Sequence, residues 1–415
     1  MNPNAAIWII AIITTAFVII RPFKLNEAIW VVCAAFILLI TQLISPAEAF
    51  TGIAKGADVY LFLTGMMLLA ETAREEKLFE WLAAVATKHA NGSARRLFIM
   101  IYLVGIIVTV FLSNDATAVV LTPAVAASMK AAKVKQSMPY LFICAFIANA
   151  ASFVLPISNP ANLVIYGKHL PSLLVWLEHF ILPSIISIGI TYLMLYKSQR
   201  KFLRQPIESN IEMPRLTRGG KAAARGICVA AIVLLLASAF HIQLGLPTLI
   251  TGAVTSLIVL LIARESPLNV IKGISWSILP LVAGLFVIVE ALIKTGLIGN
   301  ITNVLMHYTA TSPNSAAITS GAGIGIASNF TNNLPAGLIA GSVLQTASVP
   351  VIVRNAVLIG IDLGPNLSVT GSLATILWLT ALRREGHDVS AWRFLKIGVM
   401  VMIPALLLAL ASLWI

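Results

Sequence analysis

Apolar runs of around 18 residues recur from one end of this 415-residue sequence to the other. A helix of that length crosses roughly 30 Å of hydrocarbon, so each run is long enough to span a membrane. Charged residues make up 11% of the chain and hydrophobic residues 59%, whereas soluble domains carry about 25% charged residues. The sequence therefore predicts an all-α polytopic membrane protein.

The distribution of basic residues predicts how the spans are oriented. The longest polar stretch, 197–225, holds eight Lys or Arg and is expected on the cytoplasmic side of the inner membrane. Ten spans follow from that placement, near 5–20, 27–44, 58–73, 138–166, 172–196, 226–240, 247–263, 276–293, 351–379 and 397–415. All of the 28 Lys and Arg except Lys55, Lys168, Lys294 and Arg354 then lie inside. Orientation among membrane lipids, and not nucleic-acid binding, thus explains the net charge of +12.

Two further apolar segments are interrupted by polar residues. Residues 97–129 are broken at "SNDAT" and have basic residues at both ends, so they are expected to form a re-entrant hairpin that enters from the cytoplasm. Residues 315–344 are broken at "SNFTNN" and lack basic flanks, so they are expected to enter from the outside.

The two halves of the chain repeat each other. "GMMLLAE" at 65–71 and the first hairpin tip have counterparts in "GLFVIVE" at 284–290 and the second tip, roughly 215 residues later. Five spans in each half make the repeats inverted, with a first repeat at 1–196, a linker at 197–225 and a second repeat at 226–415. Transporters of this architecture bind substrate where broken helices meet. We expect the two tips to converge with 148–162 and 362–375.

Several motifs resemble one family. "SNDATAVVLTPAV", "SNFTNNLPAGL" and "IGIDLGPNLSVTGSLATILWL" are similar to the ion-transporter superfamily, and within it to the ArsB-type arsenite and antimonite efflux permeases. The resemblance implies export of trivalent arsenic or antimony in exchange for protons, a homodimer, and in some members a cytosolic arsenical-pump ATPase subunit. Docking of that subunit is the alternative role of the basic linker, whose charge the membrane topology alone explains. One departure is "ANAAS" with Asn149, where the family often has an acidic residue.

Arsenite at neutral pH is mainly uncharged As(OH)3, and hydroxyl and amide side chains both donate to and accept from such a solute. No metal ligand set or cofactor is expected. The candidate substrate-binding residues are Ser113, Asn114, Thr117, Asn149, Ser158, Asn159, Asn162, Ser328, Asn329, Thr331, Asn332, Asn333, Thr370 and Ser372. For Asn149, Ser158, Asn159 and Asn162, hydrogen bonding between helices is the alternative role.

Acidic residues in apolar surroundings are costly and point to function. Asp115 and Asp362 are the candidate proton-coupling residues, with helix capping as the alternative role for each. Glu71 and Glu290 match across the repeat near span ends, which favours a structural role.

Other function classes stay open on the same fold. A sodium- or proton-coupled transporter for a dicarboxylate or other anion is one alternative, and a sodium/proton antiporter is another. The four breaks contain no Lys or Arg, which disfavours an anion. An enzyme is not expected, since the chain has no HExxH or GxSxG motif. Cys33, Cys144 and Cys228 lie in different spans, so packing is expected for them and not thiolate ligation.

Overall fold

The computed structural model describes residues 2–208 and 213–415, and its regular elements are helices apart from one isolated bridge between Ser93 and Pro206. Seven helices in this part of the chain are long and apolar enough to cross a membrane, or eight if the bent pair α3–α4 counts as one span. This confirms the predicted all-α polytopic class. The number is below the expected ten because several spans are divided into shorter helices.

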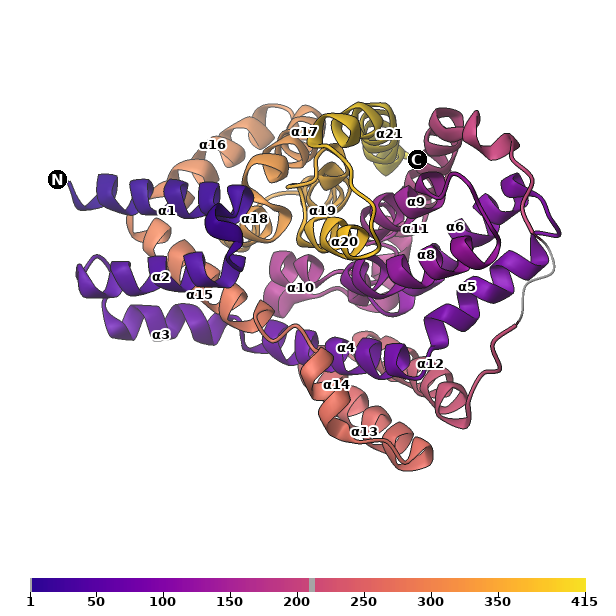
Figure 1. The fold of residues 1–415 in the computed structure, drawn as a ribbon. Coiled ribbons are helices and arrows are strands. Elements are labelled where there is room, and N and C mark those ends of the chain that lie inside the picture. Colours follow the sequence, from indigo (N-terminus) through magenta and orange to yellow (C-terminus); the bar gives the residue numbers. More distant parts are fainter. Residues whose placement is uncertain (1, 209–212) are drawn as a thin grey trace.

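Figure 1 shows how the helices are arranged. In the first half they are α1 (Pro3–Ile20), α2 (Glu27–Ile40), α3 (Pro46–Lys55), α4 (Ala57–Glu75), α5 (Leu78–His89), α6 (Ala94–Phe111), α7 (Asn114–Ala116), α8 (Thr122–Ala131), α9 (Met138–Ala150), α10 (Pro160–Tyr166) and α11 (Leu173–Gln199). In the second they are α12 (Arg218–Ala239), α13 (Gly245–Ala263), α14 (Pro267–Gly273), α15 (Ile278–Lys294), α16 (Leu297–Thr311), α17 (Pro313–Thr331), α18 (Asn333–Thr346), α19 (Val351–Leu363), α20 (Leu373–Arg384) and α21 (Ala391–Ala411).

Two of the expected spans are broken at mid-course. The chain between α9 and α10 contains a 3-10 turn over Pro156–Ser158, and the chain between α19 and α20 contains one over Gly364–Leu367. Proline has no backbone N–H to donate, which favours a helix end at these turns. The second helix of each pair has its own N-cap. The side chain of Asn159 accepts a hydrogen bond from the backbone N–H of Ala161, and the Ser372 hydroxyl accepts one from the backbone N–H of Thr375.

Helices from opposite halves pack against each other in matching pairs. α15 lies between α2 and α3 at one end of the molecule, and α13 packs along α4 (Figure 1). The α4–α13 crossing is close, since a Cβ on Gly65 would overlap the backbone oxygen of Thr248. Small residues permit such approach between membrane helices.

The linker between the halves runs from the end of α11 to the start of α12, and residues 209–212 of the predicted 197–225 segment lie outside the described residues. α6 has 18 residues, enough to cross a membrane by itself. The re-entrant course of 97–129 and 315–344 and the division into repeats at 1–196 and 226–415 therefore stay predictions.

Candidate functional site

The first polar tip, "SNDAT", joins α6 to α8 through the short α7 and a π-helical turn. The Ser113 hydroxyl accepts a hydrogen bond from the backbone N–H of Ala116 at 3.1 Å and so caps the turn. The Thr117 hydroxyl lies 2.8 Å from that of Thr109 in α6, which joins the two arms. The carboxylate of Asp115 has no hydrogen bond or ion pair within the described residues.

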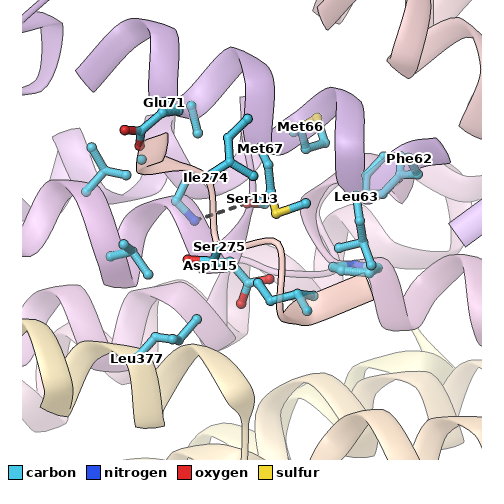
Figure 2. A pocket seen from close by; sticks show the side chains of 17 residues that line it. Phe62, Leu63, Met66, Met67, Glu71, Ser113, Asp115, Ile274, Ser275 and Leu377 are labelled. Carbon is cyan, nitrogen blue, oxygen red and sulfur yellow. Dashed lines mark hydrogen bonds between the residues drawn. The ribbon is translucent and has the colours of Figure 1, made fainter. Parts of the chain in front are cut away.

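Asp115 lines two adjoining cavities. The larger has a cavity volume of about 60 Å³, several times what one water molecule needs, so it has room for a small solute. Its walls come from the first tip, from α4 and from the segment that joins α14 to α15, and Figure 2 shows Asp115 on the opposite side of the cavity from the α4 side chains. The α4 wall consists of Phe62, Leu63, Met66, Met67, Ala70 and Glu71.

The smaller cavity collects residues from all four breaks. Asn114 and Asp115 come from the first tip, Asn159 from the first broken span, and Asn333 from the second tip. The second broken span adds the apolar start of α20. Neither cavity has a Lys or Arg among the described residues that line it. The site therefore offers amides, the hydroxyls of Ser113 and Ser275, and one unpartnered carboxylate to a bound solute.

Asp362 lies where the two broken spans cross, and it is fully buried. The Ser152 hydroxyl and one of its carboxylate oxygens are 2.8 Å apart, and the Asn159 amide donates to the other oxygen at 2.8 Å. Both partners belong to the first half of the chain, so this acid joins the halves. Its surroundings differ from those of Asp115, which faces open space.

Asn149, the departure from the family pattern, also joins the two breaks. Its amide group donates to the side-chain oxygen of Asn366 at 3.0 Å and to the Thr375 hydroxyl at 3.2 Å. The Asn366 amide in turn donates to the backbone oxygen of Phe146 at 2.9 Å. A carboxylate at position 149 could not donate to Asn366, so the asparagine fits this network.

The second tip is held by a separate set of hydrogen bonds. The Asn329 amide donates to the backbone oxygen of Gly364 at 3.0 Å, and its oxygen accepts from the Ser368 backbone and hydroxyl at 3.0 and 2.9 Å. The Thr370 hydroxyl donates to the backbone oxygen of Asn329 at 3.0 Å. Asn329 therefore fastens α17 to the break after α19.

The candidate residues thus fall into two groups. Those that line a cavity are Ser113, Asn114, Asp115, Asn159 and Asn333. Those that lie outside both cavity linings are Thr117, Asn149, Ser158, Asn162, Ser328, Asn329, Thr331, Asn332, Asp362, Thr370 and Ser372. The assignment of substrate binding and proton coupling to these residues stays a prediction.

The facing wall of the cavity was missed by sequence reasoning. Met66, Met67 and Glu71 belong to the "GMMLLAE" repeat landmark, but nothing in that pattern indicates which side chains face the tip. Gly273 is the last residue of α14, and Ser275 lies in the short break between α14 and α15. The glycine in "IKGIS" was the available signal for this break.

An all-helical fold whose broken helices meet at a cavity among apolar spans defines a multi-pass membrane transporter. The chain belongs to the citrate transporter family (CitMHS), whose model matches residues 8–359. The predicted resemblance is confirmed, since relatives named "Arsenical pump membrane protein" match in Escherichia coli, at 26% identity over 97% of both chains, and in Yersinia enterocolitica, at 28% over 82% of both.

Solved structures of transporters share the fold. The YdaH transporter of Alcanivorax borkumensis matches with a TM-score of 0.56 at 14% identity, over 88% of this chain and 86% of that one. The Neisseria gonorrhoeae MtrF protein matches with a TM-score of 0.54 at 13% identity, over 91% and 83%. These relationships show a transporter fold.

Proposed function

We propose that this protein exports trivalent arsenic and antimony from the cytoplasm across the inner membrane in exchange for protons. The observation that carries the proposal is the Asp115 carboxylate, which lines both cavities without a partner among the described residues. The names of the arsenical pump relatives support the choice of substrate.

The chemistry of the cavity fits a neutral trihydroxide. Asn114, Asn159 and Asn333 supply amides that donate and accept, and Ser113 supplies a hydroxyl. The Asp115 carboxylate can accept from a hydroxyl of As(OH)3 when ionised, and can hold a proton when the substrate has left. Because both ligands use the same group, substrate and proton bind in turn, which is what exchange requires.

The roles of the two acids follow from their surroundings. Asp362 is buried with the Ser152 hydroxyl and the Asn159 amide at its two oxygens, so we assign it the joining of the two broken spans and assign proton exchange to Asp115. The Glu71 end of the larger cavity faces the cytoplasm in the topology set by the basic linker.

Citrate is the competing substrate, since the family description names it. A tricarboxylate would face Asp115 in cavities whose described lining contains no Lys or Arg. Burying an anion beside a carboxylate without a cation is unfavourable, so the lining favours a neutral solute.

The test is uptake into everted inner-membrane vesicles, measured for arsenite, antimonite, citrate, succinate and sodium. We expect arsenite and antimonite uptake when the vesicle interior is acidic, and loss of uptake when a protonophore removes the pH gradient. Citrate uptake without arsenite uptake, or a requirement for sodium in place of the pH gradient, would overturn the proposal.

A further inference from the structure

The larger cavity has walls of two chemical kinds. The first tip contributes the Ser113 hydroxyl and the Asp115 carboxylate, whereas the α4 wall is apolar up to Glu71 at its end. Two thioethers, Met66 and Met67, belong to that apolar wall, and they are the sulfur-bearing side chains among the described residues that line this cavity. A solute bound here therefore meets oxygen groups on one side and sulfur on the other.

Of the two thioethers, Met67 is the one that reaches into the cavity. Met66 is buried, with 4% of its surface exposed, whereas Met67 is half-buried. Figure 2 shows the Met67 side chain extending from α4 toward the first tip, with its sulfur on the side of Asp115. A soft sulfur atom and an unpartnered carboxylate are thus presented to the same space.

The matching positions in the second half of the chain carry no sulfur. "GMMLLAE" corresponds to "GLFVIVE", so Met66 and Met67 correspond to Leu285 and Phe286. Both of these residues are buried in the core and line neither cavity, and Phe286 packs edge to face on Tyr60 with ring centroids 6.1 Å apart. Leucine and phenylalanine therefore satisfy the packing at these positions, and the thioethers occur in the helix that lines the cavity.

Trivalent arsenic and antimony fit a cavity with two such walls. As(OH)3 and Sb(OH)3 are pyramids that carry their hydroxyls on one side and leave the metalloid atom open on the other. The hydroxyls bind to oxygen and amide groups, while the metalloid atom is a soft acceptor that prefers sulfur donors. A thioether has no charge and no proton to lose, and it holds a soft atom weakly, so it permits release where a thiolate would not.

We propose that Met67 contacts the metalloid atom of the bound trihydroxide and sets a preference for antimonite over arsenite. The inference rests on the proposed function and names the group that selects between its substrates. The contact is noncovalent, so the three hydroxyls stay on the metalloid and no bond forms or breaks. Antimony is the larger and more polarisable of the two atoms, and a sulfur contact therefore favours it.

The first test compares antimonite and arsenite uptake by everted vesicles. Met67→Leu keeps the apolar character and approximate volume of the side chain but removes the sulfur. KM for antimonite is expected to rise about two- to twelvefold, the range for one contact as strong as a hydrogen bond, and KM for arsenite is expected to rise less. The matched control is Met100→Leu, on a half-buried methionine of α6 outside both cavity linings, which should leave both KM values unchanged.

The second test reads the contact without transport. The methionine methyl groups of the purified protein are isotope-labelled for NMR, and the Met67 signal is identified by its loss in Met67→Leu. Antimonite is expected to shift the Met67 signal and to leave the Met100 signal in place.

The outcomes separate this inference from the proposed function. A Met67 signal that antimonite does not shift, or a Met67→Leu variant that keeps the wild-type ratio of the two KM values, would overturn the role of Met67. The proposed function would stand in that case, because wild-type vesicles still take up both metalloids. Wild-type vesicles that take up neither metalloid would overturn the proposed function and this inference together.

Discussion

Asn159, which caps the start of α10, donates a hydrogen bond of 2.8 Å to the carboxylate of Asp362 in the last turn of α19. The two residues belong to opposite halves of the chain, and Asn159 also lines the smaller cavity. One amide thus connects the cavity with the buried crossing of the two broken spans. Movement of either break changes the position of a cavity residue.

Replacing Asp362 is expected to destabilise the protein. Asp362→Leu leaves the Asn159 amide buried without its acceptor, which costs about 1–3 kcal/mol, whereas the Ser152 hydroxyl can still donate to the backbone oxygen of Asn149 at 2.8 Å. The matched variant Asp362→Asn keeps one acceptor and should lose less. Thermal unfolding in detergent measures the difference, and equal melting temperatures for the two variants would contradict the joining role.

Replacing Asp115 is expected to remove the coupling to protons. Asp115→Asn keeps the size of the side chain but cannot exchange a proton, so uptake with a pH gradient should fall to the level seen without one. Asp388→Asn is the matched control. Asp388 is exposed in the loop after α20, pairs with Arg383 at the end of that helix, and lines neither cavity. Full gradient-driven uptake by Asp115→Asn, with unchanged pH dependence, would rule out this carboxyl as the proton carrier.

Two asparagines of the second tip are expected to differ in effect. Asn333 lines the smaller cavity, so Asn333→Ala should raise KM for arsenite about two- to twelvefold, the range for one lost hydrogen bond. Asn329 fastens α17 to the break after α19, so Asn329→Ala should mainly lower the melting temperature. Uptake kinetics and thermal unfolding of both variants separate the roles. The reverse pattern would exchange the two assignments.

The native cysteines are expected to be dispensable. Cys33 and Cys228 are exposed on their helices, Cys144 is buried in α9, and these three residues are not part of the lining of either cavity. Replacing them all by alanine should leave arsenite uptake within about twofold of the wild-type value, since packing is all that changes. A loss of arsenite uptake without a loss of folded protein would instead indicate thiolate ligation.

The class of fold and the positions of the breaks could be predicted from the sequence alone. Apolar runs have to span the membrane as helices, because lipid offers no partner to an open backbone. Proline and glycine residues such as Pro156 and Gly364 mark where those helices end, since their effect on the backbone is local. The two polar tips could likewise be located from short motifs.

The division of the polar residues between cavity and helix contacts was decided only by the tertiary structure. Asn159 and Asn329 have the same side chain and both lie at a break, yet only Asn159 lines a cavity. An amide is satisfied equally well by a solute or by a neighbouring helix, so its type does not indicate its partner. The same holds for Glu71 and Glu290, matched in sequence, of which one lines the cavity while the other is paired with Lys55. Glu290 lies 235 residues from Lys55 in the chain, and Asn159 lies 203 residues from Asp362, so only the packing of the two halves brings these partners together.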